Sequence, residues 1–481
     1  MPWDNVHAGH DVLRRLAAIV GAGHAITDTH DMEPYLREWR GRYVGRSPLL
    51  LQPASTQEVS AILRFAHNHG ISIVPQGGNT GLVGGQIPST AGDEVILSLT
   101  RMNRIRNVDA RGNTMIAEAG VTLKGAQDAA ADAGRLFPLS LASEGSCTIG
   151  GVLATNAGGI HVLRYGNARD LALGVEAVLA DGRIWHGLKT LRKDNTGYDL
   201  KSLLIGSEGT LGIITAAALR LFPQPADTVT ALVALPDLEA AGRLFERTGE
   251  RGGGLLSAFE LLPRIGIEFV TRHVAGARDP FAVPHPWYAL LEVSGPFADG
   301  SVLRLMEAIL EQAVEAGEAA DAVIAASQAQ ASELWRLREL MSEVQKCEGG
   351  SIKHDVSVPV ADIPRFIVGA SEEVESIVPG ARPVPFGHYG DGNIHFNISQ
   401  PSGSDTAEFL ARWDEVSRAV HDIVLRLGGS ISAEHGIGQM KAELLERVKS
   451  PVELSMMRAV KDALDPRGIL NPGKVLRRSR T

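Results

Sequence analysis

The sequence contains almost no cysteine. Only Cys147 and Cys347 occur among 481 residues, too few for a disulfide framework or a cysteine-ligated metal cluster. We therefore expect two reduced, buried thiols. An excess of positive charge is also missing, because 47 Lys and Arg are set against 56 Asp and Glu, which gives a net charge of −9. This balance argues against a nucleic-acid partner or a broad basic surface for anionic lipid.

Long uninterrupted apolar segments are missing too. The first residues, MPWDNVHAGH, show no basic region followed by an apolar run, so no secretory signal is predicted. The most apolar stretch, LLIGSEGTLGIITAAALRLF, carries Glu208 and Arg220 and is too polar to cross a bilayer. We expect a cytoplasmic enzyme with no membrane span.

What is present is the composition of an ordinary globular protein, with 44% hydrophobic and 21% charged residues. The length predicts two or three domains. Residues 1–223 alternate helical patterns such as TQEVSAILRFAHNHG with short apolar runs such as ISIVP, which predicts an α+β nucleotide-binding domain. The prolines of FPQPAD mark a boundary. Residues 224–425 contain TVTALVALP, WYALLEVSG and HFNIS between helical patterns, which predicts a domain built on an antiparallel sheet, and residues 426–481 are predicted to be mostly helical.

Three glycine clusters lie in the first region: PQGGNTGLVGG (75–85), SEGSCTIGGVLATNAGG (143–159) and GSEGTLGII (206–214). Glycine allows a backbone to approach a ligand closely, so three clusters could wrap an extended dinucleotide. The alternative is that they form only tight turns and helix contacts. None of them matches GxGxxG with an acidic residue about 20 positions later, so an NAD-binding Rossmann unit is not supported.

The stretch GHYGDGNIHFN places two histidines around an Asp-Gly pair. A two-residue hairpin turn at Asp391-Gly392 would set His388 opposite His395, with Asn397 on the same face. Opposed side chains are close enough to share one cation. The alternative is a pair of hydrogen-bonded histidines that flank a turn.

A second motif, SAEHGIG, carries Glu434 and His435 before the helical pattern QMKAELLERV. Adjacent side chains in an extended or turn segment diverge, so one can bind metal while the other faces the substrate. Two histidines and one glutamate with open positions suit zinc, or less well manganese or iron(II). The alternative is a capped helix start with a solvated Glu-His pair.

Together these motifs, with the terminal NPGKVL, resemble the vanillyl-alcohol oxidase (PCMH-type) flavoprotein superfamily, and within it the family of FAD-dependent D-2-hydroxyglutarate and D-lactate dehydrogenases. The resemblance runs from about residue 44 to the end of the chain. It implies a two-subdomain FAD-binding domain, a substrate domain with an antiparallel sheet flanked by helices, and a helical C-terminal segment that completes the active site.

The resemblance also implies roles for particular residues. The implied FAD-binding residues are Pro75, Gln76, Gly77, Gly78, Asn79, Thr80, Gly81, Ser143, Glu144, Gly145, Gly150, Asn156, Gly158, Ile213, Asn471 and Lys474. Several superfamily members attach FAD covalently through a histidine at the position that corresponds to Asn79, so the FAD is expected to be noncovalent. The implied metal ligands are His388, His395 and Glu434, and His435 is the implied base.

Substrate binding is assigned by the same resemblance to Arg338, Ser342 and Lys353, together with Asn397. A similar family member carries threonine where this chain has Ser342, so the hydroxyl is kept and the methyl is lost. From the sequence alone, ordinary surface charges on a helix and a strand are the favoured interpretation of Arg338 and Lys353; together with a metal site, substrate binding is favoured.

The expected reaction is oxidation of a D-2-hydroxy acid, first of all D-2-hydroxyglutarate to 2-oxoglutarate, with hydride transfer to the flavin and a divalent metal, expected to be Zn²⁺, at the hydroxyl. D-lactate or another D-2-hydroxy acid is an alternative substrate. A zinc hydrolase and a catalytically silent flavin-binding or scaffold protein are alternatives of other classes. The resemblance implies an electron-transfer flavoprotein or a quinone as electron acceptor, and a homodimer is compatible with it.

Overall fold

The structure is a computed structural model that describes residues 6–478. Its chain divides into two compact units. The first unit comprises residues 1–157, 167–223 and 434–481, and the second comprises residues 158–166 and 224–433. The chain therefore enters the second unit twice, and the C-terminal segment from Glu434 onward belongs to the first unit.

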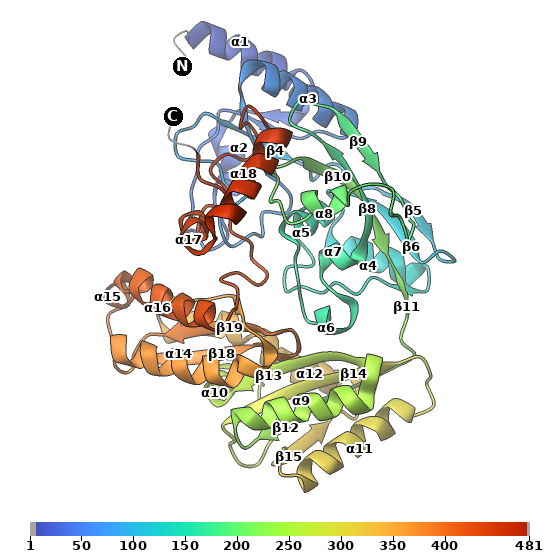
Figure 1. Cartoon of the computed structure of the whole chain (residues 1–481), viewed down its shortest axis with the longest axis vertical. Helices are drawn as coiled ribbons and strands as arrows, with labels where there is room; N and C mark the ends of the chain where they lie inside the picture. The colour runs from blue at the N-terminus through green and yellow to red at the C-terminus, as the bar shows by residue number, and fades with distance from the viewer. Residues whose placement is uncertain (1–5, 479–481) are drawn as a thin grey trace. The chain divides into compact units, whose positions relative to one another are not determined.

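The first unit contains two separate sheets (Figure 1). The smaller has the strand order β1-β2-β4-β3, formed by β1 (Ala25–Ile26), β2 (Leu50–Leu51), β4 (Glu94–Ser98) and β3 (Ser72–Gln76). The larger is antiparallel with the order β5-β6-β10-β8-β9, formed by β5 (Ile105–Asp109), β6 (Thr114–Glu118), β10 (Ile213–Arg220), β8 (Ala172–Val178) and β9 (Ile184–Gly187). A small ladder joins β7 (Arg135–Leu136) and β11 (Phe222–Pro223).

Helices surround these sheets, and α3 illustrates why they form where they do. The Ser55 side chain accepts the backbone N–H of Glu58 at the start of α3 (Thr56–His69), and Gly70 ends it in a left-handed conformation with φ 67°. The expected helix at this position is thus present. The other helices of the first unit are α1 (Val6–Ala17), α2 (Thr29–Leu36), α4 (Leu123–Asp132), α5 (Ile149–Thr155), α7 (Ala168–Leu171), α8 (Leu200–Leu204), α17 (Ala442–Val448) and α18 (Pro451–Leu464).

The second unit is built on one eight-stranded sheet with the order β15-β12-β14-β13-β18-β19-β16, in which β17 also pairs with β19. Its strands are β12 (Asp227–Leu235), β13 (Leu256–Pro263), β14 (Trp287–Gly295), β15 (Asp321–Ile324), β16 (Ser351–Ile352), β17 (Val356–Ser357), β18 (Arg382–His388) and β19 (Asn393–Ser399). All of the strand pairs are antiparallel. Strands β12, β14 and β19 fall where the sequence predicts strands.

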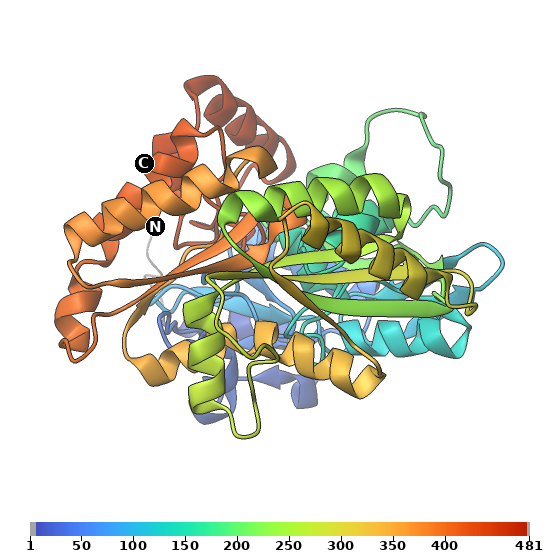
Figure 2. The same cartoon turned by 90° about the horizontal axis from the view of Figure 1, so that it is seen from below.

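Helices cover both faces of this sheet (Figure 2). One apolar cluster joins alternate strand residues such as Val233 and Leu291 to helices α9 (Leu238–Gly252), α11 (Ser301–Glu315), α14 (Ile363–Ile377) and α16 (Trp413–Arg426). The other joins the opposite set, such as Leu232 and Leu290, to α10 (Arg264–His273), α12 (Gln328–Glu339) and α13 (Met341–Val344). The short helices α6 (Val162–Tyr165) and α15 (Thr406–Ala411) complete the unit.

No helix within residues 6–478 combines the length and the apolar character that crossing a bilayer requires.

Candidate active site

Polar side chains gather on one face of the second unit's sheet. Successive strand residues point to opposite faces, and Ile394, Phe396 and Ile398 of β19 belong to the cluster on the face covered by α9 and α14. His395 and Asn397 therefore point to the other face, which α12 and α13 cover. The same alternation places His388 of β18 and Glu260 of β13 on that face, since Phe386 and Leu262 lie there.

The hairpin that carries both histidines differs from the sequence prediction in its register. Phe386, rather than His388, pairs with His395. The connection contains a 3-10 turn at Tyr389–Asp391 that ends at Gly392 with φ 84°, so the predicted two-residue turn was wrong. The register is displaced from His388 to Phe386, an even step, and strand side chains alternate with a period of two. Both histidines therefore share a face, with ring centroids 5.6 Å apart.

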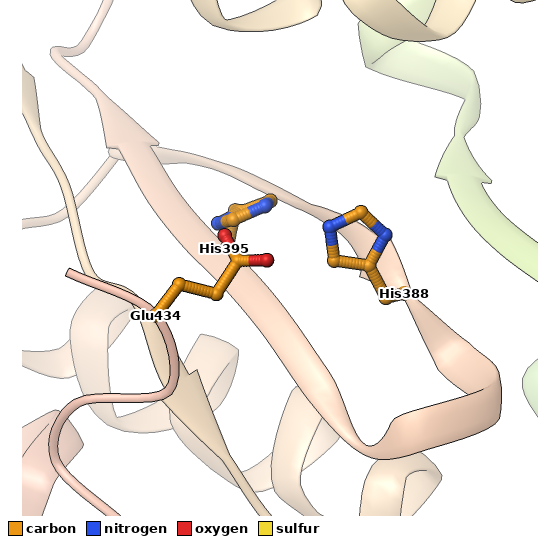
Figure 3. A group of neighbouring side chains, drawn as sticks. All are labelled: His388, His395 and Glu434. Carbon is orange, nitrogen blue, oxygen red and sulfur yellow. The ribbon is translucent and has the colours of Figure 1, made fainter. Parts of the chain in front are cut away.

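Glu434 is the first residue after the second unit, which ends at Ala433. Chain continuity thus attaches it directly to the unit that carries both histidines. His388, His395 and Glu434 each offer a ligand atom within 4.8 Å of the others, and their side chains face one another in Figure 3. By the same criterion, Asp355, Glu434 and His435 form a second group. Each group has the donor types that a divalent cation uses.

Glu260 connects two of these side chains. One carboxylate oxygen lies 2.5 Å from His388 Nδ1, and the other accepts the Nε–H of Arg338 at 2.5 Å. The guanidinium of Arg338 also lies over the Phe386 ring, 4.8 Å from its centroid. Burial alone would raise the pKa of Glu260, but the charges and hydrogen bonds of Arg338 and His388 lower it to about 2. Arg338 is therefore a buried, paired cation and not an ordinary surface charge.

The other predicted substrate residues lie in the same unit. Lys353 Nζ donates to the backbone oxygen of Ser342 at 2.7 Å and to its hydroxyl at 3.1 Å. Asn397 is 3% exposed and donates to the side-chain oxygen of Gln345 at 2.8 Å. Arg338 thus shares Glu260 with His388, and Lys353 contacts Ser342 of α13, the helix that covers the same face.

In the first unit, the first glycine cluster packs closely against the second. A Cβ on Gly77 would lie 2.3 Å from Thr148 Oγ1, and one on Gly78 would lie 1.8 Å from the Ser146 carbonyl oxygen. Only glycine allows this approach. Asn79 follows with φ 54°, donates to the backbone oxygens of Pro34 and Arg37, and keeps its own Oδ1 buried with no hydrogen-bond partner.

A cavity of about 390 Å³ adjoins the second glycine cluster. Its lining includes Gly145, Ser146 and Thr148, and the remaining lining residues are Thr100, Asn103, Ile105, Gly120, Val121, Thr122 and Gly125. Most of these residues are small or polar, which suits a polar ligand such as a phosphate ester.

Most of the remaining predicted FAD residues belong to the first two glycine clusters. Pro75 and Gln76 end β3, and Thr80 and Gly81 directly follow Asn79 in the first glycine cluster. Ser143, Glu144 and Gly145 form a turn before α5, which contains Gly150 and ends at Asn156 with φ 53°. Gly158 belongs to the second unit.

Ile213 is 1% exposed and packs in an apolar core, so any contact with a ligand would come from its backbone. Asn471 donates to the backbone oxygens of Gly85 at 2.9 Å and Glu208 at 2.8 Å. Lys474 lies 3.7 Å from Glu94, and burial lowers its pKa although Glu94 opposes that shift.

Two buried glutamates were not identified from the sequence as site residues. Glu208 adopts φ 53°, and its carboxylate accepts the backbone N–H groups of Ile437 and Gly438 at 2.7 and 2.8 Å. It thus ties the SAEHGIG motif to the third glycine cluster. Glu260 lies in the apolar run LSAFELLP. A single acidic residue in such a run indicates a buried charge that needs a partner, and this was the signal by which the sequence could have identified it.

Two family models match the sequence. The model described as FAD binding domain matches residues 47–187, and the model described as FAD linked oxidases, C-terminal domain, matches residues 224–475. The chain is 38% identical to D-2-hydroxyglutarate dehydrogenase of Xanthomonas citri pv. viticola, over 93% of each chain. It is 37% identical to a putative mitochondrial D-lactate dehydrogenase of Schizosaccharomyces pombe, over 93% of this chain and 85% of the relative.

The fold is also similar to a solved structure. The crystal structure of p-cresol methylhydroxylase with substrate bound superposes with a TM-score of 0.77, at 17% identity over 98% of each chain. At this identity the similarity concerns the fold alone. It confirms the fold class predicted from the sequence.

Proposed function

The chain belongs to the family of FAD-linked oxidases that includes D-2-hydroxyglutarate and D-lactate dehydrogenases, and from this premise we propose that it oxidises D-2-hydroxyglutarate to 2-oxoglutarate. The observation that carries the choice of substrate is that the second unit, which holds His388 and His395, also holds two cations, Arg338 and Lys353. A dicarboxylate needs a positive partner for its distal carboxylate, and one metal cannot serve both ends.

The residues present fit FAD. The close approach of Gly77 and Gly78 to the Ser146–Thr148 segment excludes side chains and leaves backbone N–H groups as the available donors. The unpartnered, buried Oδ1 of Asn79 is a further acceptor in this loop. Since Asn79 has no nucleophilic side chain, we propose that the FAD is held without a covalent bond.

The donor set also fits a divalent metal, and we propose His388, His395 and Glu434 as its ligands. Support comes from the distances among their ligand atoms and from the chemistry of two imidazoles and one carboxylate, which is typical of zinc sites that keep an open position. When bound, FAD supplies the acceptor for a hydride and the metal supplies positive charge near the substrate hydroxyl.

The chain's own residues then have distinct tasks. We assign removal of the hydroxyl proton to His435, because an imidazole is a suitable general base near neutral pH; bound FAD would accept the C2 hydride. Arg338 and Lys353 hold the distal carboxylate, and Asn397 and Ser342 supply polar contacts. The proton and the hydride together account for the two electrons and two hydrogens lost by the hydroxy acid.

The test is an anaerobic mixture of the purified, FAD-containing protein with D and L forms of 2-hydroxyglutarate, malate and lactate, followed by the flavin absorbance. D-2-hydroxyglutarate should bleach the flavin fastest, and its L form should not bleach it. Faster bleaching by D-lactate would favour the alternative substrate, for which the Schizosaccharomyces pombe relative is named. A yellow protein that no hydroxy acid bleaches would be a silent flavoprotein, and a colourless one would favour the zinc hydrolase.

The electron acceptor and location remain predictions. We propose an electron-transfer flavoprotein or a quinone as acceptor, and comparing the reoxidation rates of the reduced enzyme with each will decide between them. The cytoplasmic location predicted from the sequence is to be compared with the mitochondrial names of several relatives. Cell fractionation separates the two locations, and size-exclusion chromatography tests the homodimer.

A further inference from the structure

Glu260 is a fully buried carboxylate in the middle of a sheet. It lies in β13, which is buried along its whole length, and its own exposure is 0%. In the ladder between β13 and β18 it pairs with His388. A buried carboxylate is costly unless it is paired and hydrogen-bonded, so its partners show what it stabilises.

Each carboxylate oxygen of Glu260 contacts a different partner, one His388 and the other Arg338. Oε1 lies 2.5 Å from Nδ1 of His388, and Oε2 accepts Nε–H of Arg338 at 2.5 Å. The ionised carboxylate can only accept hydrogen bonds, so Nδ1 of His388 carries the proton. In the neutral ring this places the lone pair on Nε2, and that lone pair can bind a metal ion.

The same carboxylate fixes the orientation of Arg338. Its guanidinium is planar, so a bond at Nε together with the Phe386 ring 4.8 Å from Cζ determines the plane of the group. The terminal Nη atoms are thereby held in one direction. Arg338 is 8% exposed, so little freedom remains for another arrangement.

We propose that Glu260 is a positioning residue that couples the metal ligand His388 to the substrate-binding Arg338. This inference rests on the proposed function for the roles of those two residues. The carboxylate selects the His388 tautomer that binds metal and also aims the guanidinium at the substrate. Metal affinity and preference for a dicarboxylate thus depend on the same buried group.

Glu260→Gln tests the coupling, because the amide keeps the shape of the side chain but changes its hydrogen-bonding capacity. Glutamine offers one acceptor oxygen and one donor NH₂, so it can accept from His388 or from Arg338 but not from both. The FAD-containing full-length protein is stripped of metal, and Zn²⁺ is titrated against a chromophoric chelator. We expect the zinc Kd to rise about 10- to 100-fold, with an altered absorption spectrum when Co²⁺ replaces zinc.

Glu292→Gln is the matched control. Glu292 lies in the neighbouring strand β14, is largely buried, and also pairs with a histidine, with its Oε1 3.2 Å from Nε2 of His161. We expect its zinc Kd to equal that of the wild type even if its melting temperature falls. A merely structural role for Glu260 would lower the melting temperature of both variants and leave the zinc Kd of both unchanged, which would overturn the proposal.

Glu260→Asp serves if the glutamine variant does not fold. It keeps the negative charge that balances Arg338 but is shorter by one methylene, so it cannot reach both partners, and weaker zinc binding is again expected. Zinc binding as tight as in the wild type would refute the coupling alone. If the wild type itself binds no zinc, both the metal of the proposed function and the role of Glu260 are refuted. This outcome differs from the preceding one, in which the wild type binds zinc and only the coupling is refuted.

Discussion

Lys353→Met is the sharpest test of substrate choice. Lys353 Nζ bonds to the backbone oxygen and the hydroxyl of Ser342, both of them uncharged. Arg338→Met is a poorer test, because Glu260 would lose its guanidinium. Breaking a buried pair of that kind costs about 3–5 kcal/mol in unfolding free energy.

The expected effect follows from one charge-assisted contact with the distal carboxylate. Such a contact contributes about 1.5–3 kcal/mol, so kcat/KM for D-2-hydroxyglutarate should fall roughly 10- to 150-fold. D-lactate has no distal carboxylate and should be affected far less. Steady-state rates of both substrates with an artificial electron acceptor give the two ratios.

The control is Lys346→Met, the same substitution at an exposed lysine in the 3-10 helix Gln345–Glu348. It should leave both kcat/KM values unchanged. Equal losses for the dicarboxylate and D-lactate in Lys353→Met would place Lys353 at the common carboxylate. That outcome would remove the reason for preferring D-2-hydroxyglutarate, although not the reaction class.

Three further predictions concern the cofactors and the pH response. Acid precipitation should release intact FAD into the supernatant, because Asn79 provides no covalent attachment; flavin retained in the pellet would contradict this. His388→Ala and His395→Ala should each lower bound zinc and turnover while the flavin spectrum stays native. His435→Ala should keep the metal and lose flavin reduction. Full zinc content in both ligand variants, measured by elemental analysis, would exclude the proposed metal site. Hydrogen bonds from Arg382, His273 and Arg272 outweigh burial and lower the pKa of Glu348 from 4.5 to about 2. The contribution of the Glu348 carboxylate to the free energy of unfolding is therefore complete above pH 4.5 and is lost as the pH falls toward 2. Glu348→Gln should destabilise the protein by about 1–3 kcal/mol at neutral pH, and the difference in denaturant midpoint between variant and wild type should shrink in acid. A difference that stays constant with pH would argue against the ion pairs of Glu348.

The sequence predicted the sheet of the second unit because its pattern is local. TVTALVALP and WYALLEVSG coincide closely with β12 and β14, since buried strands are continuous apolar runs. The hairpin register could not be derived in the same way. The turn at Tyr389–Asp391 adopts a 3-10 conformation, and an Asp-Gly pair alone does not distinguish this from a two-residue turn.

The common face of His388 and His395 was nevertheless predicted correctly, for a physical reason. Side chains alternate with a period of two along a strand, so a displacement from His388 to Phe386 keeps the face, whereas a displacement by one residue would have reversed it. A prediction of which face a side chain lies on therefore stays correct when the register is wrong by an even number of residues. A prediction of a particular pair of opposed residues does not stay correct.

Glu260 shows where sequence reasoning stops. A glutamate in the apolar run LSAFELLP signals a buried charge, and a buried charge requires a partner. The partners are separated from it by 128 residues for His388 and by 78 residues for Arg338, and no local pattern connects positions so far apart. The sequence thus predicts that Glu260 needs a cation, but only the folded structure, which brings His388 of β18 and Arg338 of α12 to Glu260, identifies which cations it holds. His388 is proposed to bind metal and Arg338 to bind substrate. Because the Glu260 carboxylate contacts both, we expect metal affinity and substrate preference to change together when Glu260 is replaced.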